Sequence, residues 1–385
     1  MENAAQEKQT HVTIQGAQQS ISPDSVGEAI GNQESSVPLL HRNKRWLLMA
    51  LFSVLVLFGQ SAATLLGRLY YEKGGNSKWL SAFIQGAGFP ILLPFLYNTK
   101  DRKNNSSEQT KTPSPLVLGS IYMVLGTLLA AVGMLFSVGL LYLPVSTFSL
   151  ISATQLGFNA LFSFFLNSQK FTPLIVNSLV LLTTSSALLV LQNDDSSGSS
   201  KSYKGKYAIG FICTLLAAAL FSLILSLSQL AINKILKRQT VKELLDFLIY
   251  QSLVASCILL VGLFASGEWR TLSAEMNKFE LGKASYTMTL LWIAVCWQIF
   301  SIGMVGLILK VSSLFANVIS TLGLPIVPIL AVFIFKEKMS GVKAVGMLLA
   351  IWGFMSYIYQ HYLDDLVSKS GKKDVDSKEI SLMQN

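Results

Sequence analysis

Long uncharged apolar runs, separated by short polar or charged breaks, follow one another along most of the chain. A bilayer core of about 30 Å is crossed by roughly 20 helical residues, and each run has about that length. We therefore predict an all-α polytopic membrane protein with ten transmembrane helices, at residues 46–67, 79–97, 115–141, 144–166, 171–192, 207–232, 243–266, 285–309, 311–335 and 341–361.

Two boundaries between neighbouring runs depend on single residues. Pro144 can begin a helix but cannot sit comfortably inside one, so we expect a tight turn where the third and fourth runs meet. Only Lys310 and Val311 separate the eighth and ninth runs. Because a charge is costly at the bilayer centre, we place this lysine at a membrane interface.

The two halves of the chain resemble each other weakly. Gln169 and Glu337 lie 168 residues apart at the ends of the fourth and ninth runs, and Gly157 and Gly323 lie 166 residues apart within them. Five spans are an odd number, so two similar halves must face opposite ways, as in the inverted repeats of many secondary transporters. This plan places a substrate site near the midplane, between the halves.

These patterns divide the chain into five parts. Residues 1–44 are rich in Gln, Ser and Glu, and the first apolar run begins too late for a signal peptide. We expect a disordered tail there and a second one at 363–385. Between the tails we expect a first five-helix repeat at 45–192, a loop at 193–206 and a second five-helix repeat at 207–362.

The composition excludes several classes of protein. Only 13% of the residues are charged, against about 25% in soluble chains, which excludes a cytosolic enzyme. The three cysteines lie inside apolar runs and imply no disulfide framework. We attribute the net charge of +9 to basic residues in the loops and tails on one side of the membrane, and not to a nucleic-acid-binding surface. With both termini in the cytoplasm, 18 of the 30 lysines and arginines lie on that side, as the positive-inside rule favours.

The polar groups at membrane depth are mainly carboxamides. No Asp, Glu, Lys, Arg or His lies in the central portion of any run, so we expect a neutral cargo. Ser152, Gln155 and Asn159 share one face of the fourth run. Gln85 and Gln298 lie within the second and eighth runs. A carboxamide presents donors and an acceptor side by side, an array that can meet the edge of a nucleobase.

Aromatic rings supply a second recognition element, which is stacking. Trp292 and Trp297 lie in the eighth run but are five positions apart, so at most one of them faces a cavity, and we favour Trp292. Amides and a stacking ring together predict a small, flat, uncharged heterocycle as cargo. Glutamine and asparagine also hold membrane helices together, so a packing role stays open for each amide.

Two pairs of prolines interrupt apolar runs. Pro90 and Pro94 lie in the second run, and Pro325 and Pro328 lie in the ninth. Proline frees backbone carbonyl groups and kinks a helix. In transporters such breaks often lie beside the binding site, and a purely structural kink is the alternative.

Three blocks of sequence carry a family resemblance. They comprise Gly67–Tyr71, Gly74–Leu80 and Ala87–Leu92, then Tyr142–Thr147, Gln155–Ala160 and Phe164–Pro173, and finally Asn317–Pro328 and Lys336–Met339. Over about residues 45–362 the chain is similar to the plant purine permeases.

That resemblance implies a ten-helix fold of the drug/metabolite transporter superfamily. It also implies uptake of adenine, related purine derivatives and adenine-type cytokinins, driven by the proton gradient. Other family members carry alkaloids or vitamin B6 forms, so another neutral nitrogen heterocycle, or a facilitator or exporter, stays open as an alternative. From the resemblance we expect the plasma membrane, with internal membranes open, and we expect a monomer.

The expected mechanism is alternating access of a site between the two halves. We expect the heterocycle's edge to be bound by the carboxamides and Ser152, and its face by Trp292. No buried carboxylate or histidine is available for a proton relay, so Glu72, Asp246 and Glu337, which lie near span ends, are the candidates for proton coupling.

Two other classes of membrane protein are alternatives to a transporter. A membrane-embedded enzyme would need a cluster of His, Asp, Glu or Cys near an interface, and the chain has only three histidines. We therefore expect no enzymatic activity, no cofactor and no metal site. A receptor or structural protein would not need inverted halves.

Overall fold

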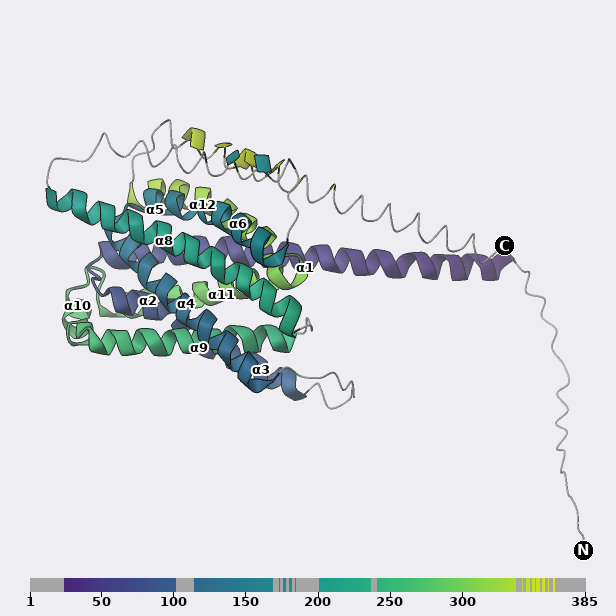
Figure 1. Cartoon of the computed structure of the whole chain (residues 1–385), viewed down its shortest axis with the longest axis horizontal. Coiled ribbons are helices and arrows are strands. Elements are labelled where there is room, and N and C mark those ends of the chain that lie inside the picture. The colour runs from purple at the N-terminus through teal and green to yellow at the C-terminus, as the bar shows by residue number, and fades with distance from the viewer. Residues whose placement is uncertain are drawn as a thin grey trace, which may run out of the picture. The chain divides into compact units, whose positions relative to one another are not determined.

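A computed structural model of the whole chain (Figure 1) describes residues 24–101, 114–168, 201–236 and 241–336 continuously, with isolated positions within 173–184 and 341–363. Within these residues all regular structure is helical. The chain divides into two units, Met1–Leu48 and Met49–Asn385. The first contains the beginning of α1 (Asp24–Glu72), and the second contains every later element.

Seven stretches of the described residues are long and apolar enough to cross a membrane. Four of them come before residue 170: Trp46–Glu72 in α1, Lys78–Tyr97, Pro115–Tyr142 (α4) and Val145–Asn167. The second of these comprises α2 (Lys78–Ala87), η1 (Phe89–Leu92) and most of α3 (Leu93–Asp101), and the fourth comprises α5 (Val145–Ser152) and α6 (Gln155–Asn167). The other three are Gly205–Ile235 in α8 (Lys201–Ala231) and η3 (Ile232–Leu236), Lys242–Ala265 in α9 (Val241–Ala265), and Lys283–Lys310 (α11). They confirm the predicted spans one to four and six to eight.

The remaining predicted spans are only partly described. α12 (Ser313–Phe335) occupies the ninth, while most of the fifth and tenth lie outside the described residues. Ten spans, and their arrangement as inverted repeats, therefore stay predictions. Between α9 and α11 the chain forms two short elements, η4 (Glu268–Arg270) and α10 (Leu272–Lys278).

Local sequence explains where the helices begin and end. α4 ends at Tyr142 and α5 begins at Val145, so the tight turn predicted at Pro144 is confirmed. The predicted break after Lys310 is confirmed too, because α12 begins at Ser313. There the Ser312 hydroxyl accepts a hydrogen bond of 3.1 Å from the backbone N–H of Phe315, a side-chain cap of the helix N-terminus.

Breaks within the spans agree only partly with the proline pattern. The second span is interrupted as predicted, by the 3₁₀ turn that contains Pro90. The fourth span is interrupted without a proline, between Ser152 and Gln155. The interruption predicted for the ninth span is wrong, because α12 continues through its two prolines. Neighbouring helices and local adjustments can satisfy the backbone groups that such prolines free in a membrane helix.

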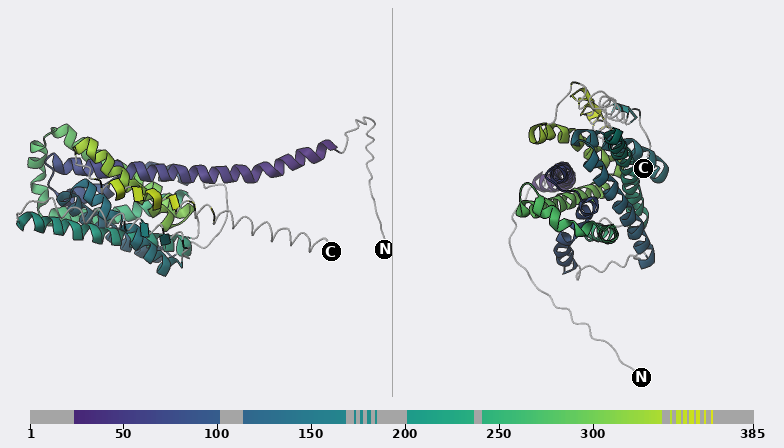
Figure 2. Two further views of the ribbon diagram at one scale, coloured as in Figure 1. Left: turned by 90° about the horizontal axis from the view of Figure 1, so that it is seen from above. Right: turned by 90° about the vertical axis from the view of Figure 1, so that its left-hand side faces the viewer.

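Glycines allow α1 and α11 to pack closely against each other. A Cβ atom at Gly59 would lie 2.6 Å from the backbone nitrogen of Phe300, and one at Gly303 would lie 2.8 Å from the carbonyl oxygen of Phe52. Small residues at such crossings bring the backbones together, which is how membrane helices gain packing energy. Most of the long helices run in a similar direction, as the two views of Figure 2 show.

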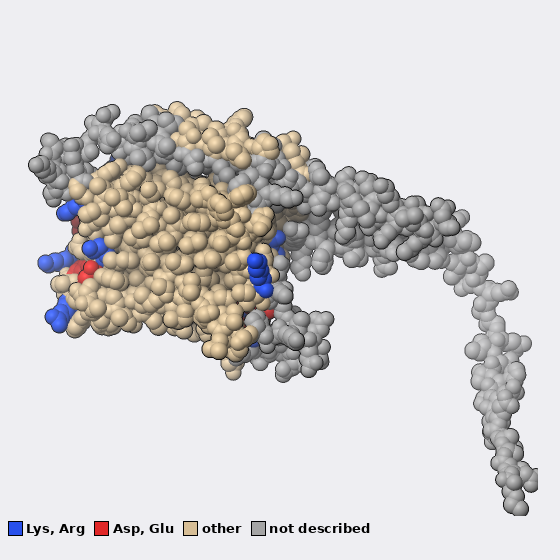
Figure 3. All heavy atoms as spheres, in the orientation of Figure 1, with Lys and Arg blue, Asp and Glu red and all other residues tan. Residues whose placement is uncertain are grey.

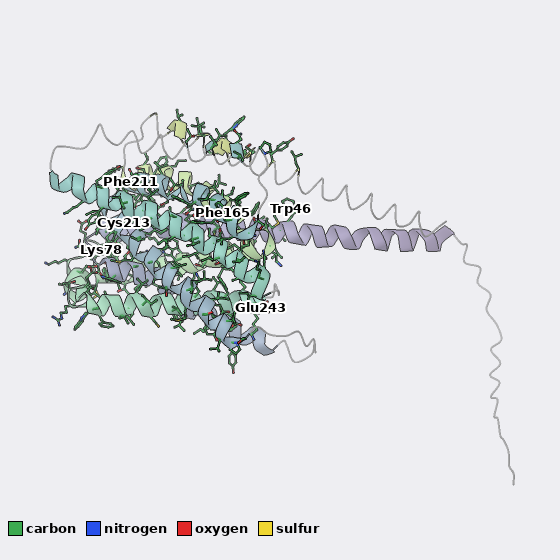
Figure 4. All side chains as sticks on the ribbon, viewed as in Figure 1. Trp46, Lys78, Phe165, Phe211, Cys213 and Glu243 are labelled. Atoms are coloured by element: carbon green, nitrogen blue, oxygen red, sulfur yellow. The ribbon has the colours of Figure 1, made fainter. Side chains whose placement is uncertain are left out.

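The surface of the Met49–Asn385 unit has an uncharged flank between two charged ends (Figure 3). Lys78 and Glu243 lie at opposite ends of the bundle (Figure 4). Large apolar side chains are exposed on the flank, among them Phe165, which is 71% exposed, and Ile212, which is 62% exposed. Contiguous apolar surface of this kind is typical of a membrane-facing region.

Candidate functional site

A cavity lies between α2 and α4 from the N-terminal half of the chain and α8, α9 and α11 from the C-terminal half. It contains about 870 Å³ of space between protein atoms, part of it open to the surroundings. Its walls are mainly apolar with a few polar groups, as is usual for small-molecule sites between helices. None of the lining residues is charged, so the walls favour a neutral ligand over an ion.

Gln251 of α9 contributes the main unused polar group of the cavity. It is only 8% exposed and lines the cavity. Its side-chain amide forms no hydrogen bond with any residue that the structure describes. Because this amide lines the cavity and is not a fully enclosed polar group, it is available to a ligand. Sequence reasoning missed Gln251, although a carboxamide inside an apolar run was the same signal that identified Gln85.

Gln85 of α2 lines the same cavity, as predicted from its place in the second run. Its amide nitrogen donates hydrogen bonds to the hydroxyl of Ser137, at 3.3 Å, and to the carbonyl oxygen of Gly133, at 3.5 Å. Both distances exceed the usual 2.9–3.0 Å for such bonds. Within the described part of the chain its amide oxygen accepts no hydrogen bond, so it too can meet a ligand.

Aromatic side chains line the cavity from α8 and α11. The ring of Phe300 packs edge-to-face on Trp297, with centroids 5.3 Å apart, and stacks on Phe221 at 6.2 Å. Trp292, the ring that the sequence favoured, is 56% exposed and does not line this cavity, whereas Trp297 does. Five residues correspond to about 140° around a helix, so the two rings cannot face the same way.

Gln298 lies next to the cavity lining but not in it. Its side chain is buried, and its amide nitrogen donates a hydrogen bond of 3.4 Å to the carbonyl oxygen of Gly86, while its amide oxygen has no partner. A Cβ atom at Gly88 would lie 2.5 Å from the Cγ atom of Gln298. The glycine therefore provides the space in which this side chain packs against α2.

The carboxamide pair of the fourth span lies elsewhere, in the contacts of α6 with α8 and α12. Asn159 donates a hydrogen bond of 3.1 Å to the carbonyl oxygen of Ser313, and its own oxygen accepts one of 2.9 Å from the hydroxyl of Ser226. Gln155 donates to the hydroxyl of Ser320, at 3.2 Å, which in turn donates to the amide oxygen of Gln60.

The break in the fourth span is part of the same polar network. The carbonyl oxygen of Gln155, the first residue of α6 after the break, accepts hydrogen bonds from Ser222, at 2.6 Å, and from Asn317, at 3.0 Å. Ser152 donates instead to the carbonyl oxygen of Phe148 within its own helix. Ser152, Gln155 and Asn159 are all absent from the cavity lining. The structure therefore places these three predicted ligand residues in helix contacts, the packing role that the sequence left open.

The acidic candidates for proton coupling lie at the ends of the bundle. Glu72 forms an ion pair with Arg68, at 3.0 Å, and its side chain is 33% exposed. Asp246 lies half-buried near the beginning of α9, and Glu337 lies outside the described residues. A further acid, Glu275 of α10, is only 7% exposed. Its burial could not be predicted from the sequence, because it lies in a polar stretch between two apolar runs.

Comparison with known proteins identifies the family. A family model described as purine nucleobase transmembrane transport (PUNUT) matches residues 47–367. Purine permease 21 of Arabidopsis thaliana is 54% identical over 93% of this chain and 92% of its own length. Probable purine permease 10 of the same plant is 53% identical, over 94% of this chain and 90% of its own.

The family and the fold agree with each other. Apolar membrane-crossing helices, an uncharged cavity and permeases as relatives over nearly the whole chain describe a membrane transporter and not an enzyme. The chain belongs to the purine permease family of purine nucleobase transmembrane transporters.

Proposed function

We propose that the protein moves purine nucleobases and adenine-type cytokinins across a membrane by alternating access, and that the cavity is its substrate site. The observation that carries this proposal is the unpaired amide of Gln251 in an uncharged cavity that Gln85 also lines. The names of the relatives, all purine permeases, support the class of cargo.

The polar and aromatic groups of the cavity suit the two surfaces of a purine. The amides of Gln85 and Gln251 can bind donors and acceptors along its edge, as carboxamides do with adenine. Trp297 and the phenylalanines beside it can stack on its face. The apolar remainder of the wall suits the hydrocarbon side chain that distinguishes a cytokinin from adenine.

The affinity expected from these contacts suits a carrier. Stacking contributes about 1–3 kcal/mol per base, and two or three hydrogen bonds contribute about 0.5–1.5 kcal/mol each. The sum of about 2–7.5 kcal/mol corresponds to millimolar to micromolar binding at best. A transporter must release its cargo, so tighter binding would bring no advantage.

Alternating access is supported by the origin of the cavity walls. α2 and α4 come from one predicted repeat, and α8, α9 and α11 come from the other. Rocking of one bundle against the other would open the cavity to each side in turn. We further propose that uptake is driven by protons. We also propose that the chain crosses the membrane ten times and has both termini in the cytoplasm.

Counterflow in proteoliposomes tests the proposed cargo. Purified protein is reconstituted with unlabelled adenine inside the vesicles, and entry of radiolabelled adenine is followed, with trans-zeatin, pyridoxine and a pyridine alkaloid as competitors outside. We expect adenine to exchange, and trans-zeatin to compete better than pyridoxine or the alkaloid. Exchange of pyridoxine or the alkaloid without exchange of adenine would contradict the proposal and select the alternative cargo.

A further inference from the structure

Glu275 is a buried carboxylate at the end of the bundle where α1 ends and α2 begins. It lies in α10, the short helix that connects α9 to α11 (Figure 1), and is 7% exposed. Both oxygens of its carboxylate accept hydrogen bonds. The hydroxyl of Tyr70 donates to Oε1 at 2.5 Å, the hydroxyl of Tyr286 donates to the same oxygen at 3.1 Å, and the backbone N–H of Ser77 donates to Oε2 at 3.2 Å.

These three donors come from different elements. Tyr70 belongs to the last turns of α1, Ser77 is the N-cap of α2, and Tyr286 belongs to the first turn of α11. One carboxylate of α10 therefore joins α1 and α2 of the N-terminal half to the first turn of α11 in the C-terminal half. In a transporter that works by alternating access, contacts between the halves at one end must break each time that end opens.

Within the described part of the chain, Glu275 has no ion-pair partner. Among the described residues, the groups that face it are Tyr70 and Tyr71 of α1 and Tyr286 of α11. From η4, the Glu268 carboxylate accepts hydrogen bonds from the Ser77 hydroxyl, at 2.6 Å, and from the backbone of Trp79, at 3.2 Å.

Two cations of this end are paired with other carboxylates: Lys73 with Glu280 at 2.8 Å, and Arg68 with Glu72. Lys278, three residues after Glu275 in α10, and Arg270, which lies over the ring of Trp269, form no ion pair with Glu275. Among the described residues, the direct partners of the Glu275 carboxylate are therefore hydrogen-bond donors. A carboxylate in such a place can take up a proton without breaking an ion pair, and the neutral acid accepts weaker hydrogen bonds than the anion does.

We propose that Glu275 is the proton-binding group of the transport cycle, in place of Glu72, Asp246 and Glu337. As an anion it holds α1 and α2 against α10 and α11, and it keeps this end of the bundle closed. Proton uptake from the medium at this end weakens the bonds from Tyr70, Tyr286 and Ser77 and allows the end to open. The proton leaves to the opposite side of the membrane as that side opens, and the restored anion holds this end closed again. α2 carries Gln85 and α11 carries Trp297, so the helices that the carboxylate joins also line the cavity. This inference rests on the proposed transport function.

Glu275→Gln separates proton coupling from exchange, because glutamine keeps the size of the side chain but cannot take up a proton. Accumulation of adenine driven by an imposed inward proton gradient is compared with counterflow at equal pH. We expect accumulation to fall at least ten-fold and counterflow to stay within two-fold of wild type. Glu280→Gln, an exposed acid of the same connector, is the matched control and should keep both activities.

Two results with Glu275→Gln would overturn the inference. One is accumulation at the wild-type level. The other is loss of counterflow together with accumulation in a variant whose thermal unfolding is unchanged, because Glu275 would then be needed for substrate movement itself. Wild-type protein without any purine counterflow would instead overturn the proposed function, and the inference with it.

A second variant keeps the carboxylate and tests the role of Glu275 even if Glu275→Gln does not fold. Tyr70→Phe combined with Tyr286→Phe retains both rings but removes two donors to the anion. We expect the midpoint of the pH profile of accumulation to move upward, because the variant loses two donors that favour the anion. An unchanged midpoint would overturn the inference.

Discussion

At the scale of single residues, the carboxamides inside this protein have two different roles, and hydrogen bonding separates them. Gln251 and Asn159 are both more than nine-tenths buried. Asn159 uses its nitrogen and its oxygen within the protein, whereas Gln251 bonds with neither to any described residue and lines the cavity. Residue type and helical position predicted that amides would lie at membrane depth. The partner of each amide depends on side chains from distant helices, which no local pattern contains.

Gln251→Leu should weaken substrate binding without weakening the fold. The variant loses one hydrogen bond to the purine, worth about 0.5–1.5 kcal/mol, which corresponds to a rise of about 2- to 13-fold in the dissociation constant. Thermal unfolding in detergent should be unchanged or slightly stabilised, because no protein partner is lost. The check is saturation binding of adenine, and wild-type affinity in this variant would contradict the assignment.

Asn159→Ala should have the opposite effect. It removes the bond to the carbonyl of Ser313 and the bond from the hydroxyl of Ser226, which keeps only its contact of 3.3 Å with the hydroxyl of Ser163. We expect a cost of about 0.6–3 kcal/mol in a membrane protein. We expect a lower unfolding temperature, with near-normal adenine affinity in the protein that remains folded. Lost affinity at an unchanged unfolding temperature would return Asn159 to the binding site predicted from its sequence.

At the scale of helices, hydrophobicity and proline predicted most boundaries but not all breaks. The turn at Pro144 and the interruption near Pro90 agree with the sequence. The break before Gln155 has no proline. Ser222 and Asn317 from other helices donate hydrogen bonds to the carbonyl oxygen of Gln155, the first residue after the break. The prolines of α12 do not end that helix, because neighbouring helices can satisfy the backbone groups that they free.

Gly59→Val should disrupt the contact between α1 and α11. The added side chain would meet the backbone of Phe300, which cannot move aside as a flexible side chain could. We expect little folded protein after purification, measured by size-exclusion chromatography. Gly119→Ala is the control, because a Cβ at Gly119 meets nothing within 4 Å. Equal yields of the two variants would contradict this packing.

At the scale of the whole molecule, the sequence predicted a bundle of apolar helices with a neutral site, and it identified one of the two cavity amides. It could not choose between Trp292 and Trp297, because the rotation of α11 is set by its neighbours. It also could not reveal Glu275, whose burial arises from the meeting of α1, α2, α10 and α11.

The predicted topology can be tested by chemical labelling. In a background without Cys213, Cys257 and Cys296, a cysteine at Glu280 should react with a membrane-impermeant maleimide added outside the cell. A cysteine at Lys310 should react only after permeabilisation, because the positive-inside rule places it in the cytoplasm. Labelling of both from outside, or the reverse pattern, would contradict cytoplasmic termini.

The most direct test of the account is adenine counterflow by Gln85→Leu combined with Gln251→Leu, beside wild type and Trp292→Leu, which alters the ring outside the cavity. We predict rapid exchange by wild type and by the Trp292 variant, and at least ten-fold slower exchange by the double variant at subsaturating adenine. Exchange is measured per folded protein, because Gln85→Leu also removes the hydrogen bonds to Ser137 and Gly133. Wild-type exchange by the double variant would contradict the claim that these two amides hold the purine.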